Sequence, residues 1–200
     1  MVFASPIFLG YFLPLVLGGY YLLPATGPAR NRWLLGASYV FYGWWDPRLV
    51  PALFALTLAT FGLARWLGRE DLPASRRRLG LAVGIGLALA VLFVGKYLGF
   101  AFDNYDRLAA GLGWAPAPAT RWALPLGISF FTFHAISTLV DVHRRDAKPM
   151  ASLVDFACYL AFFPQLIAGP ILRFGAIAPA YAERRHSWAR FSSGLALFSL

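Results

Sequence analysis

Six long stretches without a charged residue constrain the fold of this chain more than any other feature. They are Met1–Ala29, Trp33–Trp45, Leu49–Ala64, Leu79–Gly95, Trp122–Val140 and Phe156–Leu172. Several approach the roughly 20 residues that an α-helix needs to span a bilayer. The hydrophobic share of 59% and the mean hydropathy of +0.60 are higher than soluble domains have. The sequence therefore predicts an all-α polytopic membrane protein with about five spanning helices.

The residues that flank these stretches favour a lipid environment over nucleic acid. All seven tryptophans lie at or beyond the ends of apolar stretches, as interfacial anchors do. The net charge of +9 comes from basic residues in short loops, without any nucleic-acid-binding pattern. We therefore expect a lipid bilayer, and no nucleic acid, as a partner. The single cysteine, Cys158, excludes an intrachain disulfide, and the three histidines share no metal-ligand spacing.

Turn and glycine signals predict how the helices connect and pack. The tripeptide Asp46-Pro47-Arg48 is a turn signal between two apolar stretches. Residues 101–121 have a mixed composition with two prolines, so we expect an extramembrane loop there. Gly80 and Gly84 are four residues apart, a spacing that allows another helix to approach closely.

The apolar stretch 156–172 differs from the others because it contains its own helix breakers. Pro164, Gly169 and Pro170 interrupt it, and Gln165 places an amide near its middle. Proline removes a backbone donor and clashes with the preceding turn, so a continuous helix is not expected. In lipid, broken backbone persists only where protein or a water-filled cavity covers the freed polar groups. The stretch is therefore either a functional wall or a proline-kinked structural helix.

The distribution of Lys and Arg favours a re-entrant form of this stretch. With the N-terminus outside and every apolar stretch spanning, ten basic residues face the inside and eight face the outside. If residues 156–172 instead enter and return, the count becomes fourteen to four. The positive-inside rule favours the second arrangement. We therefore expect a multi-pass protein of the cell membrane, with its N-terminus outside and a re-entrant segment at 156–172.

His134 is the one histidine within an apolar stretch. An intramembrane ionisable group is a functional candidate by default, but a neutral histidine hydrogen-bonded to a neighbouring helix explains it at least as well. No Gly-x-Ser-x-Gly motif, and no Ser/His/Asp constellation that the sequence can place, accompanies it. Asp141 and Arg144, three residues apart, are spaced to pair on one helical face, with interfacial anchoring as their expected role.

Four blocks of this sequence resemble membrane-bound O-acyltransferases. The first two are M-V-F-A-S-P-I-F-L at the start of the chain and R-N-R-W-L-L-G-A-S-Y-V-F-Y-G-W-W-D-P from Arg30. The others are L-P-L-G-I-S-F-F-T-F-H at Leu124–His134 and F-F-P-Q-L-I-A-G-P-I-L-R-F at Phe162–Phe174. The blocks follow the order of the family. They are most similar to its alginate O-acetylase membrane subunits, with the teichoic acid D-alanyl transfer proteins more distant.

The resemblance implies that residues 1–200 are the N-terminal portion of a single transmembrane acyltransferase domain, truncated within a further helix. Such an enzyme would move an acyl group, with acetyl expected, from a cytoplasmic thioester donor to hydroxyl groups of an exported polysaccharide. No bound cofactor is expected, and periplasmic acetylation proteins are candidate partners.

The resemblance also implies where the site residues lie. The catalytic histidine of the family is in a later apolar segment, so we expect no catalytic residue in this chain and no activity from it alone. His134 departs from the family pattern, which commonly has glutamine at that position. The candidate residues for the substrate tunnel are Gln165, Pro164, Gly169, Pro170, Arg173, Ser129 and His134.

Two other classes of function remain open on the sequence. A transporter is expected to show a second broken segment in an internal repeat, and none is found in these residues. A non-catalytic membrane anchor that binds a partner protein has the same helical composition as the acyltransferase. The DNA downstream of Leu200 distinguishes these alternatives, because an uninterrupted frame with an intramembrane histidine favours the enzyme.

Overall fold

The computed structural model describes residues 5–24, 28–117, 127–167, 172–182, 184 and 187–199. These residues form helices and connecting segments, and none of them lies in a β-strand. The prediction of an all-α protein is therefore confirmed for the described chain. The elements are the π-helix η1 (Phe8–Phe12), α1 (Leu13–Leu22), α2 (Ala29–Trp45), the 3-10 helix η2 (Pro47–Leu49), α3 (Val50–Leu67), α4 (Ala74–Leu112), α5 (Ile128–Arg144), α6 (Leu153–Ala161), α7 (Phe163–Ile167), α8 (Phe174–Ala182) and α9 (Trp188–Ser199).

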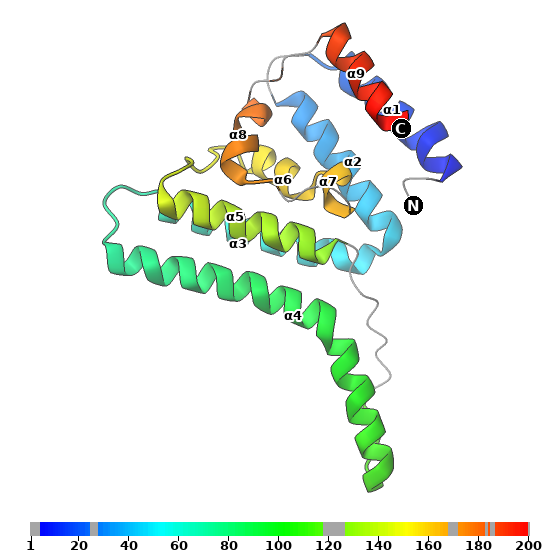
Figure 1. Ribbon diagram of the computed structural model, residues 1–200, viewed down its shortest axis with the longest axis vertical. Helices are drawn as coiled ribbons and strands as arrows, with labels where there is room; N and C mark the ends of the chain where they lie inside the picture. The colour runs from blue at the N-terminus through cyan, green and yellow to red at the C-terminus, as the bar shows by residue number, and fades with distance from the viewer. Residues whose placement is uncertain are drawn as a thin grey trace.

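The N-terminal helix is irregular and packs on α2. Pro14 lies in the first turn of α1, directly after the π-helical turn, where its missing N–H removes one bond from the helical ladder. Gly19 lets the indole of Trp33 approach the backbone of α1. The Trp33 Nε1 donates a hydrogen bond to the carbonyl of Val16 at 2.9 Å. These contacts hold α1 against the first half of α2 (Figure 1).

The turn between α2 and α3 forms as the sequence predicts. Asp46 has an extended backbone after the last residue of α2, and its carboxylate accepts a hydrogen bond from the N–H of Arg48 at 2.9 Å. Pro47 follows at the first position of η2, where no backbone donor is needed. The Asp46-Pro47-Arg48 turn is therefore confirmed.

The first part of α4 lies beside α3 and α5 (Figure 1). Gly80 faces the indole of Trp66 on α3, and Gly84 faces Leu139 on α5. A Cβ atom added at Gly84 would lie 2.6 Å from a methyl group of Leu139, so this close approach depends on glycine. The predicted close contact at both glycines is confirmed.

The length of α4 corrects one prediction. The helix runs from Ala74 to Leu112 without a break, so residues 101–112 are helical and not part of a loop. Gly113, with φ +69°, ends the helix in a left-handed conformation that suits glycine. The mixed composition of this stretch reflects a helix with a charged side and an apolar side, which composition alone does not separate from a loop.

Two segments of the described chain are long and apolar enough to cross a membrane by length and composition. They are Pro47–Leu67 and Ala74–Leu112, and Phe8–Leu22 is apolar but shorter. The count of about five spanning helices therefore stays a prediction.

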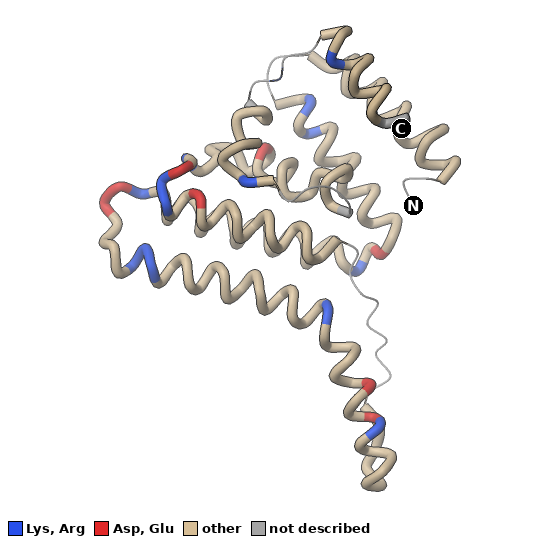
Figure 2. Tube along the Cα trace, viewed as in Figure 1, with Lys and Arg blue, Asp and Glu red and all other residues tan. Residues whose placement is uncertain are grey.

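Lys and Arg residues gather where several helices begin or end (Figure 2). Arg65, near the end of α3, donates to the carbonyl of Ala151 at 3.1 Å, just before α6. Arg77, in the first turn of α4, donates to the carbonyl of His143 near the end of α5. We call this part of the molecule, with the ends of α3 and α5 and the starts of α4 and α6, the basic end.

Candidate functional site

The apolar stretch 156–172 is broken at Phe162, between α6 and α7. Phe162 has φ −56° and ψ 111°, which is not helical, and Pro164 lies in the first turn of the new helix. The hydroxyl of Ser38 on α2, fully buried, accepts a hydrogen bond from the freed N–H of Phe163 at 3.2 Å. The predicted helix break is confirmed, and protein covers the polar backbone at the break.

After the break, the chain returns to the basic end. The N–H of Phe174 donates to the Ser137 hydroxyl at 3.1 Å, and the N–H of Gly175 donates to Asp141 Oδ2 at 3.0 Å. Ser137 and Asp141 lie in the last turns of α5, whose C-terminus leads into α6. The described residues thus leave the basic end at α6 and are back beside it at Phe174, and we call this part of the chain, 153–174, the hairpin.

Asp141 therefore has a different role from the one its spacing suggests. Its carboxylate caps the start of α8, and no ion pair to Arg144 forms among the described residues. The pairing that the three-residue spacing allows does not form, since Arg144 is exposed and the Asp141 carboxylate accepts from the backbone N–H of Gly175.

Asn31, at the start of α2, links α6 of the hairpin to α8, which follows it. Its amide nitrogen donates to the carboxylate of Asp155 on α6 at 2.6 Å and to the carbonyl of Tyr181 on α8 at 3.0 Å. Asn31 is itself buried, so these bonds are shielded from water. The start of α2 thereby sets the spacing between α6 and α8.

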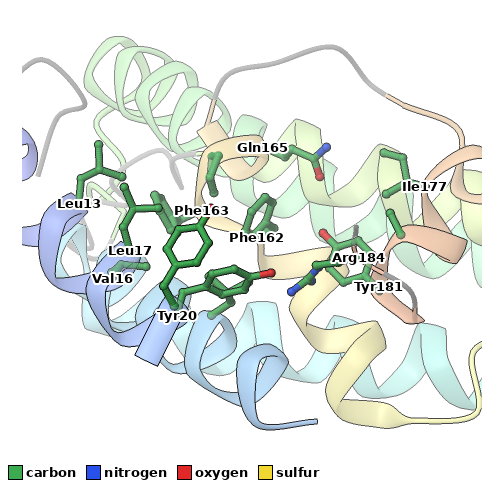
Figure 3. A pocket seen from close by; sticks show the side chains of 14 residues that line it. Leu13, Val16, Leu17, Tyr20, Phe162, Phe163, Gln165, Ile177, Tyr181 and Arg184 are labelled. Carbon is green, nitrogen blue, oxygen red and sulfur yellow. The ribbon is translucent and has the colours of Figure 1, made fainter. Parts of the chain in front are cut away.

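A cavity of about 400 Å³ lies where α1 faces α7 and α8 (Figure 3). Its wall is mostly aliphatic and aromatic, and Gln165 and Arg184 bring polar groups to it. Figure 3 shows Tyr20 and Phe163 facing across the cavity from Arg184 and Tyr181. The lining residues are Leu13, Val16, Leu17, Tyr20, Tyr21, Leu34, Phe162, Phe163, Pro164, Gln165, Ile177, Ala180, Tyr181 and Arg184.

The polar groups of this cavity are held without ion pairs in the described chain. The guanidinium of Arg184 lies 5.1 Å from the ring centre of Tyr181 and 5.7 Å from that of Tyr20. Such contacts between a cation and aromatic rings are attractive and help to hold the guanidinium in place. The Oε1 atom of Gln165 is buried and has no hydrogen-bond partner among the residues that the structure describes. The cavity thus presents a cation and a free acceptor within an apolar wall.

The structure brings together only part of the predicted tunnel residues. Pro164 and Gln165 line the cavity, whereas Arg173 is exposed at the basic end, away from that lining. Gly169 and Pro170 lie outside the described residues. Ser129 is half-buried in the first turn of α5 and does not line the cavity.

His134 is buried elsewhere, between α5 and α6. Its side chain is 1% exposed, and its ring centre lies 5.6 Å from that of Tyr159 in an edge-to-face arrangement. The Nε2 atom has no hydrogen-bond partner in the described chain. His134 therefore does not meet Gln165 in the cavity.

The sequence does not single out three of the lining residues, Tyr20, Tyr181 and Arg184. Tyr20 is one of several aromatic residues in the first apolar stretch, and Arg184 is one of many loop arginines. Their meeting depends on the return of the chain through α8, which local sequence does not encode. No local signal in the sequence singles out Tyr181 and Arg184, because α8 ends at Ala182 and Arg184 lies beyond it.

The basic end owes its charge to arginine. Burial, together with the guanidinium groups of Arg77, Arg78 and Arg144, lowers the pKa of His143 below its ordinary value. His143 is accordingly neutral at neutral pH. Among the described residues, no three His, Cys, Asp or Glu side chains are grouped so as to hold a metal ion.

Sequence comparison relates the chain to polysaccharide-modifying enzymes over its whole length. A protein named probable alginate O-acetylase from Azotobacter vinelandii is 39% identical over 198 residues, which is 99% of this chain and 39% of that protein. The probable alginate O-acetylase of Pseudomonas aeruginosa is 37% identical over 99% of this chain and 38% of its own length. Over its whole length, the chain is therefore similar in sequence to proteins named alginate O-acetylase.

The chain also matches a more distant protein, and it covers only part of each relative. A peptidoglycan O-acetyltransferase of Helicobacter pylori is more distant. It is 27% identical over 100% of this chain and 43% of that protein. The chain spans about two fifths of the length of these curated relatives. No family model matches the sequence, and no solved structure matches at a significant level.

Proposed function

We propose that these residues are the N-terminal portion of a membrane O-acetyltransferase that acetylates hydroxyl groups of an exported polysaccharide. The observation that carries the proposal is the identity of 37–39% to proteins named alginate O-acetylase over 99% of this chain. The more distant relative acts, by its name, on peptidoglycan, which is also an extracytoplasmic glycan. O-acetyl transfer to a glycan is the activity common to these names.

The proposed reaction moves an acetyl group from a thioester to an alcohol. The carbonyl carbon forms a bond to the hydroxyl oxygen and its bond to sulfur breaks. A general base takes the hydroxyl proton, and the thiolate leaving group is protonated to a thiol. In this proposal the base is a histidine outside residues 1–200, and no bound cofactor takes part.

In the proposed topology, the basic end lies on the cytoplasmic side and the N-terminus outside. About five helices span, and residues 153–174 form a re-entrant hairpin, so that fourteen basic residues face the cytoplasm and four the outside. The hairpin geometry supports this arrangement, since both of its ends lie beside the end of α5.

We assign the cavity beside Gln165 to the substrate path. Its apolar wall excludes water, and the amide of Gln165 offers both a donor and an acceptor to a polar ligand group. Arg173, exposed at the basic end, would attract an anionic thioester donor from the cytoplasm.

The proposal is tested by complementation. The complete gene that contains these residues is expressed in Pseudomonas aeruginosa lacking its own alginate O-acetylase, and the ester content of the secreted alginate is measured. Restored O-acetylation is the expected result. A protein that reaches the membrane at normal levels and leaves both alginate and peptidoglycan unacetylated contradicts the proposed function.

A further inference from the structure

The second half of α4 leaves the helix bundle. At about 1.5 Å per residue, the 39 residues of α4 extend over about 58 Å, nearly twice the ~30 Å of a bilayer core. Figure 1 shows that α4 bends and that its second half turns steeply away from the direction of α3 and α5. The first half buries Gly80, Gly84 and Ala88 against the bundle, whereas the second half buries only Ala109. One straight crossing does not account for this helix.

The charged residues of the second half lie on one side. At about 100° per residue, Lys96, Asp103, Asp106 and Arg107 fall within an arc of about 100°. Because two are basic and two are acidic, their formal charges cancel. This side is suited to water and carries no excess charge that would favour an anionic partner.

The opposite side is apolar and exposed. Leu108 and Leu112 are 65% and 59% exposed, and Tyr97 and Tyr105 are also exposed. The polar residue on this side, Asn104, donates its amide to the carbonyl of Phe100 at 2.7 Å, which lowers its need for water.

The end of the helix leaves this apolar side open. After Gly113, the chain folds back, and the N–H of Ala117 donates to Asp106 Oδ1 at 2.7 Å. The hydroxyl of Tyr105 donates to the carbonyl of Ala115 at 3.3 Å, and Trp114 remains 61% exposed. Residues 114–117 therefore cover the flank of the helix beside Ala109 and Tyr105, whereas Leu108 and Leu112 on the apolar side remain 65% and 59% exposed.

We infer that residues 97–114 form an interfacial helix that lies in the headgroup region of the bilayer face opposite the basic end. The apolar side enters the acyl boundary, the charged side faces water, and the aromatic residues lie at the headgroup level. A lipid interface is the occupant that fits, since α4 has just crossed the bilayer and bends at the level where the membrane ends. The inference rests on the proposed topology for its side of the membrane, and not on the proposed chemistry.

The test measures membrane depth along the helix. Single nitroxide labels are placed from residue 100 to residue 112 in a Cys158→Ser background, and the protein is reconstituted in vesicles of phosphatidylethanolamine and phosphatidylglycerol. Collision with oxygen reports lipid exposure, and collision with a water-soluble nickel chelate reports aqueous exposure. The matched pair is Leu108 and Arg107, which are adjacent in sequence but about 100° apart around the helix, one on the apolar side and one on the charged side. Leu87, exposed in the first half of α4, is the reference for a deep position.

We expect the ratio of oxygen to nickel collisions to be several-fold higher at Leu108 than at Arg107. It should oscillate with the helical period, at a constant depth shallower than that of Leu87. A ratio that changes steadily along the helix would mean that this half continues through the membrane. Aqueous exposure of all labels would mean that it projects into solution, and protection of Leu108 from both reagents would mean that protein covers it. Each of these three outcomes overturns the inference, whatever the acetylation assay shows.

Discussion

The hydroxyl of Ser38 on α2 accepts a hydrogen bond from the backbone N–H of Phe163 at 3.2 Å and donates one to the carbonyl of Leu34 at 2.7 Å. Ser38 is fully buried, as is the backbone that it supports. The Phe163 N–H loses its helical partner where Phe162 leaves the helical conformation. A side chain from α2 therefore supplies the acceptor that a break within an apolar environment requires.

We predict that Ser38→Ala destabilises the protein by about 1–3 kcal/mol, because the Phe163 N–H is then buried without a partner. The measurement is thermal unfolding of the purified protein in detergent. Ser192→Ala is the matched control, since the Ser192 hydroxyl also donates to a backbone carbonyl, at 3.0 Å, but is exposed. Equal melting temperatures for the two variants would show that the Ser38 bond does not support the break.

The sequence predicts the helices well where the physical signal is local. The break near Pro164 follows from the missing proline donor, and the contact at Gly84 follows from the absence of a side chain. The helical state of residues 101–112 could not be recognised from composition, because Asp103 and Asp106 share one side of an amphipathic helix that resembles a loop in linear order.

The candidate site is predicted less completely because its residues come from distant parts of the chain. Gln165 is recognisable as an amide within an apolar stretch, and it lines the cavity. Tyr20 and Arg184 are 164 positions apart and meet only because the hairpin returns along α2. The link from Asn31 to Asp155 that sets this geometry is equally non-local. No periodicity within one segment encodes such contacts.

If residues 153–174 enter and leave the membrane on one side, the residues before and after them lie on that same side. Single cysteines at Asp146 and Ser187, each in a Cys158→Ser background, should both be labelled from the cytoplasmic side by an impermeant maleimide. Both positions are exposed, whereas Ala147 is half-buried near Gly175 and would label poorly.

The control for this labelling is Arg48→Cys, in the turn between α2 and α3. The Arg48 side chain is 88% exposed, and this turn lies at the other end of α3 from Arg65. Arg48→Cys should be labelled only from the outside. If cysteines at Asp146 and Ser187 are labelled from opposite sides, then residues 153–174 cross the membrane completely.

Residues 1–200 alone are predicted to have no acetyltransferase activity. The physical reason is that no His, Asp or Glu of the described residues lines the cavity, and His134 is buried away from that lining. The measurement is acetyl transfer to alginate by purified residues 1–200. Robust transfer would contradict the prediction, and His134→Ala in the same protein would then show whether that residue is the base.

Gly113 and Gly127 both have a positive φ but differ in their surroundings. Alanine substitutions at the two positions therefore separate the cost of backbone strain from the cost of a steric clash. Gly113 has φ +69° and open space around it, whereas Gly127 has φ +72° and faces the backbone carbonyl of Leu166 on α7. Alanine at either position carries a left-handed strain of about 1–2 kcal/mol. Gly127→Ala should cost more than Gly113→Ala, because a backbone carbonyl cannot rotate away as a side chain can. Similar melting temperatures would mean that the start of α5 does not pack on α7.

Gln165→Leu is predicted to lower acetylation while the protein remains stable. If residues 162–167 are only a kinked structural helix, leucine should be tolerated, since it removes a polar group from an apolar setting. If they line a substrate path, the change removes an amide whose Oε1 is buried without a partner in the described chain. A lost transition-state contact of about 1–3 kcal/mol lowers the rate roughly 5- to 150-fold.

Asn104→Leu, which removes an amide outside the cavity, is the control and should retain the parent rate. The measurements are acetyl content of the polymer, membrane level and melting temperature in the complete protein. Unchanged acetylation by a well-expressed Gln165→Leu protein would assign the residue to structure alone.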